Sequence, residues 1–315
     1  MNAQSPVSPS KTSSSPESLP ERRKFKLMTF ARNLILWLKQ PGVILSLPAL
    51  FVFIAGFVGP LVLVVLYSFM PPRTFSFNQL PTLDNFATIL QDGYYLSYAW
   101  SIGLALVTTL ILLAICWPVA YGLSKVFKRS MIITLLLVLP LFVSENVRLF
   151  GWVLTLLNHG VLDGTVRTLF GWELPDLLYN VPVTVLGMVY IYLPFMLFPM
   201  SLGISMVPDT CREAAFDMGA TRWQVFKEVE LPLAMPGIMI GSLLTFVLVL
   251  GSISEAKILG GQSIIMISHD IETAFTYAQN WPLGSALSTL LILITAVLVI
   301  GLLSRLNLDN LLSRK

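Results

Sequence analysis

The chain has 315 residues, of which 55% are hydrophobic and only 12% are charged. Soluble domains carry about 25% charged residues, so this composition excludes an ordinary soluble protein and favours one that crosses a membrane several times. The formal net charge of +3 is too small to indicate a nucleic-acid partner, and the two cysteines have no spacing typical of a metal site or a disulfide framework.

The amino-terminal part of the chain predicts two segments that precede the first span. Residues 1–24 are rich in Ser and Pro and predict a disordered cytoplasmic tail, because they cannot bury enough apolar surface to become ordered. Residues 25–42 predict an interfacial helix, since apolar side chains recur at helical spacing from Phe30 to Leu38. A basic cluster followed by a full-length span, with no small-residue cleavage site, argues against a secretory signal peptide. Residues 304–315 predict a second cytoplasmic tail.

Long apolar runs predict six transmembrane helices, because a bilayer core of about 30 Å needs roughly 20 apolar residues in a helix. The predicted spans are 43–69, 97–124, 131–157, 183–206, 236–256 and 283–303. The fold class is therefore an all-α membrane protein with a six-helix domain at 43–303. The far end of the fifth predicted span is polar.

The distribution of basic residues predicts the orientation of these spans. Sixteen of the 20 Lys and Arg residues fall in the two tails and in the connections after the second and fourth spans, which all lie on one side if there are six spans. Basic residues accumulate on the cytoplasmic side of membrane proteins. Both termini are therefore predicted to be cytoplasmic, as is the polar loop at 207–235 between the fourth and fifth spans.

This polar loop predicts two short helices joined by a turn. Pro208 suits the start of a helix, and Gly219 suits a helix end that requires positive φ. Thr221 and Gln224 have the spacing of a capping box at the start of a second helix, which Pro232 is expected to end. An apolar stripe is expected along the first helix, formed by Val207, Cys211, Ala214, Ala215 and Met218. These residues alone leave open whether the loop rests on lipid or binds another protein.

The residue order within the loop adds a family resemblance. Glu213-Ala214-Ala215 is followed by Gly219 and, at the end of the loop, by Leu231-Pro232. This order, between the fourth and fifth spans, resembles the EAA loop of the membrane-spanning subunits of binding-protein-dependent ABC importers. The stretches LVLPLFVSENVRLFGW, ILGGQSIIMI and NWPLGSALS extend the resemblance to the spermidine/putrescine branch over most of 43–303.

The resemblance implies a type I ABC importer permease fold in which the loop fits a groove on an ATPase subunit and transmits its closure to the spans. The residues implied in ATPase coupling are Glu213, Ala214, Ala215, Asp217, Gly219, Arg222, Leu231 and Pro232. The implied partners are a dimer of ATPase subunits, a second permease subunit, a periplasmic solute-binding protein and membrane lipid in a bacterial inner membrane. A heterodimeric pore is favoured over a homodimer. The chain has no phosphate-binding loop, so catalytic, cofactor and metal sites are not expected in it, and ATP and Mg belong to the partner ATPase.

Polar side chains within or near the spans are candidates for the solute pathway, because ionisable groups are costly at membrane depth. The candidates are Glu145, Asn146, Arg148, Tyr190, Tyr192, Ser254 and Glu255. Two of these, Glu145 and Arg148, are three residues apart and are expected to neutralise each other, while aromatic packing is the simpler role for the two tyrosines.

The charges of these candidates leave the solute open. Glu145 and Glu255, the latter expected near the outer mouth, suit a cationic solute such as a polyamine. Arg148 and Lys257 equally suit a carboxylate, as in an amino-acid-derived or opine-like solute. The stretch before Leu-Gly-Gly also departs from the spermidine/putrescine branch, which usually has an aromatic residue and a proline there.

Two other classes of function remain open from the sequence. A secondary transporter driven by an ion gradient could use Glu145 or Glu255 as a proton site. A membrane scaffold without transport is the third possibility. Co-purification of an ATPase and ATP dependence of uptake in vesicles would distinguish an ABC importer from both.

Overall fold

The structure is a computed structural model. It describes residues 41–76, 78–126, 131–172, 174–261 and 263–305, and every regular element within them is a helix. The predicted tail at 1–24 lies outside these residues, as do nearly all of the predicted interfacial helix and most of the tail at 304–315. The chain divides into two compact units, residues 1–63 and 64–315.

One continuous helical stretch begins in the first unit and ends in the second. It consists of α2 (Pro41–Phe53), the π-helical turn η1 (Ile54–Val58) and α3 (Gly59–Tyr67). Residues 48–67 are long and apolar enough to cross a bilayer, in agreement with the first predicted span. Exposed side chains such as Phe51 follow one another along this stretch, as expected for a helix whose surroundings are lipid.

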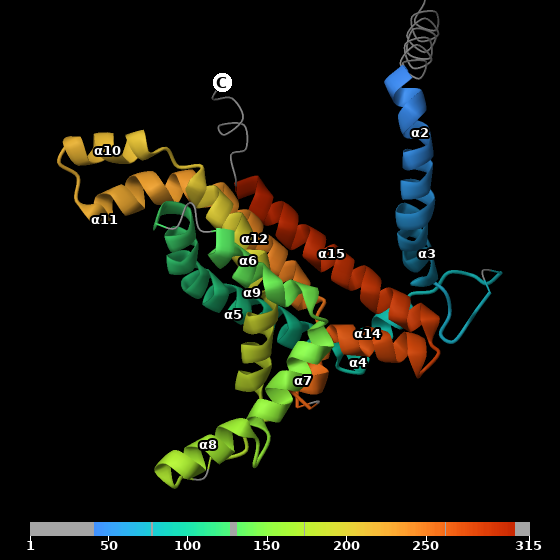
Figure 1. Ribbon diagram of the computed structural model, residues 1–315. Coiled ribbons are helices and arrows are strands. Elements are labelled where there is room, and N and C mark those ends of the chain that lie inside the picture. Colours follow the sequence, from blue (N-terminus) through green and yellow to red (C-terminus); the bar gives the residue numbers. More distant parts are fainter. Residues whose placement is uncertain (1–40, 77, 127–130, 173, 262, 306–315) are drawn as a thin grey trace, which may run out of the picture. The chain divides into compact units, whose positions relative to one another are not determined.

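Four long helices form the framework of the second unit. They are α5 (Tyr94–Tyr121), continued by the π-helical turn η2 (Gly122–Val126), α9 (Val181–Ser205), α12 (Leu231–Leu250) and α15 (Trp281–Arg305). Each coincides largely with a helical segment that is long and apolar enough to span a membrane. The main hydrophobic core forms where α5, α9 and α12 pack together, and Figure 1 shows these helices side by side.

Two glycines allow α9 and α12 to approach within backbone contact. A Cβ atom on Gly237 of α12 would lie 2.5 Å from the carbonyl oxygen of Pro199 and 2.6 Å from the Cα of Gly203, both in α9. These distances are shorter than any van der Waals contact, so only glycine fits at this position. Small residues commonly allow such close packing between membrane helices.

The predicted third span at 131–157 is broken in the structure. Its elements are α6 (Met131–Val138), the 3₁₀ turn η3 (Leu139–Phe142), α7 (Glu145–Leu156) and α8 (Val161–Phe170). The chain leaves the helix at Val143, which has an extended backbone (φ −97°, ψ 134°), and the two halves are bent by 98°. Pro140 lacks a backbone donor and weakens the helix just before the break. The predicted span at 131–157 therefore corresponds to a sharply bent pair of helices, and five helices, or six if this pair counts as one, qualify as spans among the described residues.

The fifth predicted span, at 236–256, begins earlier and ends earlier than expected. A helix runs without a large bend from α11 (Arg222–Gln224) through the π-helical turn η4 (Val225–Glu230) to the end of α12. The expected stop at Pro232 is wrong. The π-helical turn ends at Glu230, and Pro232 falls in the first turn of α12, where a missing N–H is tolerated. The polar residues after Leu250 form a separate short helix, α13 (Ser254–Ile258).

A second, smaller core joins two short helices to the long ones. It forms where α4 (Asp84–Gln91) and α14 (Ile267–Thr276) pack against α5 and α15. The hydroxyl of Tyr98 donates a hydrogen bond to the carbonyl of Leu287 at 2.7 Å, which satisfies a polar group inside this core.

Candidate functional site

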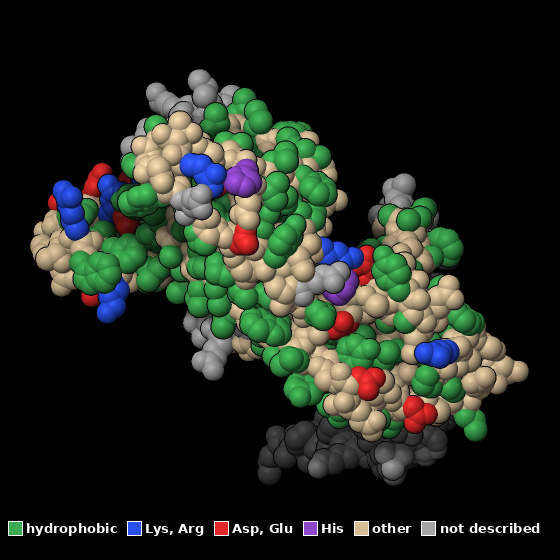
Figure 2. All heavy atoms as spheres, turned by 90° about the horizontal axis from the view of Figure 1, so that it is seen from below, with side chains coloured by type: hydrophobic (Ala, Val, Ile, Leu, Met, Phe, Trp, Pro, Cys, Tyr) green, Lys and Arg blue, Asp and Glu red, His purple; other side chains and the backbone are tan. Residues whose placement is uncertain are grey.

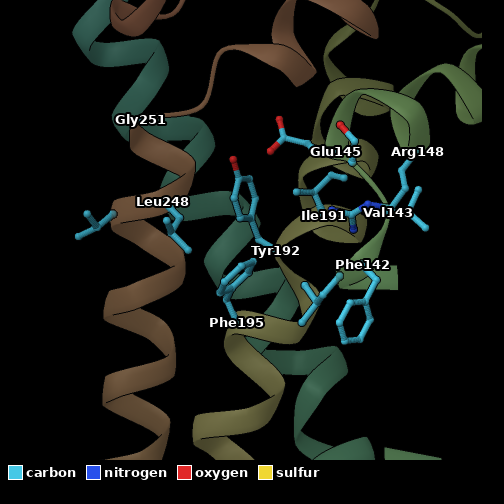
Figure 3. A pocket seen from close by; sticks show the side chains of 12 residues that line it. Phe142, Val143, Glu145, Arg148, Ile191, Tyr192, Phe195, Leu248 and Gly251 are labelled. Carbon is cyan, nitrogen blue, oxygen red and sulfur yellow. The ribbon is translucent and has the colours of Figure 1, made fainter. Parts of the chain in front are cut away.

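A cavity of about 640 Å³ lies where η3 and α7 meet α9 and the end of α12. Glu145, Arg148 and Tyr192 are among the side chains that line it, as Figure 3 shows. Phe142 and Phe195, which were not identified from the sequence, add aromatic walls. Three of the seven predicted pathway residues therefore share one cavity.

The helix break places Glu145 in this cavity. Because α7 begins at Glu145, its carboxylate belongs to the first turn of a helix, where unpaired backbone N–H groups favour a negative charge. The neighbouring Asn146 is exposed and is not among the residues that line the cavity. Glu145 thus supplies an acidic group to the cavity, whereas Asn146 does not take part in it.

Arg148 does not form the expected ion pair. Within the described residues no salt bridge joins Arg148 to Glu145, and Nε and Nη1 of the guanidinium are buried without a hydrogen-bond partner. The guanidinium instead lies over the ring of Tyr190, 5.8 Å from its centroid. Tyr190 in turn packs edge-to-face on Trp152 at 5.7 Å. The expected neutralisation of the two charges is therefore contradicted, and Tyr190 has the aromatic packing role that was expected of it.

Glu255 is fully buried in α13, and its predicted place near the outer mouth stays a prediction. One carboxylate oxygen accepts a hydrogen bond from the Ser252 hydroxyl, and the other has no partner among the described residues. Ser254 is half-buried, and neither it nor Glu255 lines the cavity. Lys257 forms an ion pair with Glu272, so its charge is already neutralised.

The 207–235 segment contains a short helix, α10 (Asp209–Asp217), and the start of a second helix at α11, both as predicted, but the second helix continues into α12. The capping box is present: the Thr221 N–H donates to Gln224 Oε1 at 2.8 Å, and the Gln224 N–H donates to Thr221 Oγ1 at 3.4 Å. Gly219 has φ +84°, which glycine adopts without the steric penalty of other residues. Local sequence chemistry thus determines this part of the structure.

The expected apolar stripe on α10 is only partly buried. Val207 and Ala215 are buried, but Cys211, Ala214 and Met218 are exposed, because α10 packs mainly against η4 and only one of its sides is covered. The exposed members of the predicted coupling set are Glu213, Ala214, Asp217, Gly219, Arg222 and Pro232, whereas Leu231 is half-buried and Ala215 is buried. Charged side chains gather where α10 and α11 lie, at the left of Figure 2, beside a largely hydrophobic surface.

Residues 123–314 match the family described as binding-protein-dependent transport system inner membrane component. The chain belongs to this permease family. The match covers more than half of the chain and includes both the cavity and the 207–235 segment.

The permease has relatives over most of its length. It is 33% identical over 244 residues to the spermidine/putrescine transport system permease protein PotB of Haemophilus influenzae, a match of 76% of this chain and 85% of that protein. It is 31% identical over 257 residues to PotB of Escherichia coli, covering 81% of this chain and 90% of the relative. The inner membrane ABC transporter permease protein YdcU of Escherichia coli is 25% identical over 230 residues, with 69% and 73% covered.

Solved structures show the fold. A chain of a bacterial ABC transporter involved in the import of the acidic polysaccharide alginate superposes with a TM-score of 0.69 at 17% identity, covering 90% of the permease and 99% of that chain. A second structure, of the alginate transporter in complex with alginate pentasaccharide-bound periplasmic protein, gives 0.64 at 16% identity, with 91% and 96% covered. The fold is therefore that of a type I ABC importer permease.

Family membership defines the general role of the permease. It is a multi-pass inner-membrane component of a binding-protein-dependent ABC importer, which also contains an ATPase and a periplasmic binding protein. A permease subunit is a transport component without catalytic activity, and ATP is handled by the ATPase. The ion-gradient-driven transporter and the scaffold without transport are thereby set aside.

The aromatic walls of the cavity were missed because the sequence carries no signal for them. Phe195 lies in α9, which is apolar on all sides, so hydrophobic periodicity does not identify the face that meets the cavity. Phe142 lies at a break whose geometry depends on the surrounding helices. Only the tertiary structure brings these rings to the same place as Glu145.

Proposed function

We propose that the permease forms one half of the translocation pathway for a small polar solute that carries at least one ammonium group, with a polyamine favoured. The observation that carries this proposal is the cavity that combines Glu145 with the rings of Tyr192, Phe142 and Phe195. A carboxylate attracts an ammonium group, and aromatic faces add a favourable interaction with cations. The names of the relatives, spermidine/putrescine permeases, support a polyamine.

An amino-acid-derived or opine-like solute is the second candidate. Arg148 lines the same cavity, and two of its guanidinium nitrogens are buried without a partner among the described residues. A guanidinium in this state suits a carboxylate, which would accept two hydrogen bonds from it. A solute with both an amine and a carboxylate would then engage Glu145 and Arg148 together.

The 207–235 segment is proposed to be the coupling loop that docks on the ATPase. Glu213 and Asp217 present exposed negative charges there, and the exposed Ala214 permits close approach of a partner backbone. Gly219 and Arg222, both exposed, are assigned to the turn and to the second helix of this surface. Ala215 is covered by the segment itself, so its proposed role is to pack the loop. Leu231 and Pro232 would connect the loop to α12.

The arrangement in the membrane follows from the same proposal. The basic residues support an orientation in which both termini and the 207–235 segment face the cytoplasm. A second, different permease subunit would supply the other half of the pathway, and a homodimer is the lesser possibility. Lipid would cover the remaining apolar surface, and no nucleic-acid partner is expected.

The proposal is tested with the complete importer in proteoliposomes that contain the permease, its ATPase, its second permease and its solute receptor. The receptor is first screened for solutes that raise its melting temperature, with spermidine, putrescine, amino-acid derivatives, opine-like conjugates and small anions as probes. ATP-dependent uptake of the solute found is then measured. Uptake of a polyamine supports the favoured form, and uptake of an amine-carboxylate solute supports the second. A receptor and importer specific for an anion without an amine would refute both.

A further inference from the structure

The π-helical turn η2, which continues the end of α5, holds the start of the 207–235 segment through a buried lysine. Lys125 Nζ lies 2.9 Å from Asp209 Oδ1 and donates a hydrogen bond to the carbonyl of Val207 at 2.8 Å. The Lys125 side chain is only 5% exposed, so its charge is stable there only while these partners remain in place. Val207 and Asp209 lie where the chain leaves α9 and α10 begins, and Lys125 therefore fastens this junction to α5.

A second polar contact joins both helices of the segment to α5. Arg212 Nη1 in α10 lies 3.7 Å from Glu230 Oε1 in η4. The Tyr121 hydroxyl of α5 donates to Glu230 Oε1 at 3.4 Å and accepts a hydrogen bond from Arg212 Nη1 at 3.3 Å. The Glu230 side chain is 9% exposed, so it too depends on its partners. Tyr121 thus contacts the beginning and the end of the segment at once.

Apolar and backbone contacts surround these two polar contacts. The rings of Trp117 in α5 and Phe226 in η4 meet edge-to-face with centroids 5.2 Å apart. Ser124 Oγ donates to the carbonyl of Ser201 in α9 at 2.8 Å. The end of α5 is therefore held to α9, to α10 and to η4 by separate interactions.

We propose that Lys125 and Tyr121 are positioning residues that make α5 move together with the 207–235 segment during transport. The term α5 contacts is used here for Lys125 with Asp209 and for Tyr121 with Arg212 and Glu230. The segment is joined to α9 and α12 by the polypeptide chain. When the segment moves, α5 moves with it only if contacts between α5 and its neighbours persist during the movement. The α5 contacts supply a direct polar link, beside the Trp117–Phe226 contact and the packing of α5 against α9 and α12. The inference rests on the proposed role of the segment as the ATPase-docking surface.

The first test compares two variants in the complete importer in proteoliposomes. Lys125→Met removes one α5 contact, whereas Arg73→Met removes a basic side chain at an exposed position outside the 207–235 segment. Because changes along a coupling network alter coupling by 0.5–2 kcal/mol, the amount of solute transported per ATP hydrolysed is expected to fall by about 2- to 30-fold in Lys125→Met and to stay at the wild-type value in Arg73→Met. Equal ratios in the two variants would overturn the proposal.

Charge reversal tests whether the ion pair between Arg212 and Glu230 is needed for coupling. Arg212→Glu and Glu230→Arg are each expected to lower the solute-to-ATP ratio, and the double variant is expected to recover it, since the opposite charges are restored. A double variant that assembles but remains as uncoupled as the singles would contradict the role of this ion pair. If the single variants fail to assemble, the comparison of Lys125→Met with Arg73→Met decides.

The native Cys211 distinguishes failure of this inference from failure of the proposed function. Cys211 is exposed on α10, whereas Cys116 is buried, so a thiol-directed photo-cross-linker labels α10 selectively. Cross-linking of Cys211 to the ATPase is expected in the wild type and in Lys125→Met alike. Absence of the cross-link in the wild type would refute the docking role of the segment. A normal cross-link together with an unchanged solute-to-ATP ratio in Lys125→Met would refute only the role of the α5 contacts.

Discussion

The contact between α9 and α12 predicts that Gly237→Ala destabilises the protein although alanine is the better helix former. The new Cβ would lie 2.5 Å from the Pro199 carbonyl oxygen and 2.6 Å from the Gly203 Cα. Both are backbone atoms, so no side chain can rotate away and the two helices must separate. Overpacking of this kind costs about 1–3 kcal/mol, whereas replacement of a helical glycine by alanine stabilises by about 0.5–1 kcal/mol.

Gly103→Ala is the matched control for this prediction. Gly103 lies in the long helix α5, and a Cβ there would have no atom within 4 Å. Both variants gain the same helix-propensity contribution, so the difference in their free energies of unfolding isolates the contact and is expected to be about 1–3 kcal/mol. Unfolding by SDS titration in mixed micelles, followed by tryptophan fluorescence, measures it. Equal stability of the two variants would refute backbone contact between α9 and α12 at this point.

Three further predictions concern coupling, the cavity and pH. Gly219→Val places a β-branched residue at positive φ, with about 1–3 kcal/mol of local strain, and is expected to lower uptake per ATP without loss of membrane insertion. Gly171→Val, at φ +71° directly after α8, carries the same strain and should leave the ratio of uptake to ATP hydrolysis unchanged. Glu145→Gln removes a charged hydrogen-bond acceptor worth about 1.5–3 kcal/mol, so the solute concentration that gives half-maximal uptake should rise at least about tenfold. Asn146→Ala is the control and should leave this concentration unaltered. Burial raises the pKa of Asp270 in the folded protein. As the pH rises, the carboxyl therefore ionises first in the unfolded chain, near pH 4, and the free energy of unfolding should fall with rising pH until the folded carboxyl also ionises. Asp270→Asn should remove this fall, and an identical pH profile of stability in the two proteins would count against the prediction.

The features that the sequence determined are those that depend on neighbouring residues. Long apolar runs predicted most of the spans, because the backbone of a spanning segment must satisfy its own hydrogen bonds and therefore forms a helix. Thr221 and Gln224 predicted a capping box, and Gly219 predicted a turn with positive φ, because each of these features requires only residues within one or two helical turns. The order of residues in the same loop also carried the resemblance to the permease family.

Boundaries and partners of individual residues were decided only by the tertiary structure. The break at Val143 and the helix that continues through Pro232 depend on how the surrounding helices pack, which local preference does not specify. The spacing of Glu145 and Arg148 is compatible with an ion pair, yet Arg148 lies over Tyr190 of another helix.

The contacts at the end of α5 were likewise not predictable from the sequence. Tyr121 and Glu230 form a hydrogen bond although they are 109 positions apart in the sequence. No pattern around either residue indicates that it contacts the other. In helices that are apolar on all sides, periodicity does not distinguish the lipid-facing side from the side that meets a cavity or another helix. Packing between distant segments makes that distinction, and it therefore determines which charged and aromatic side chains meet.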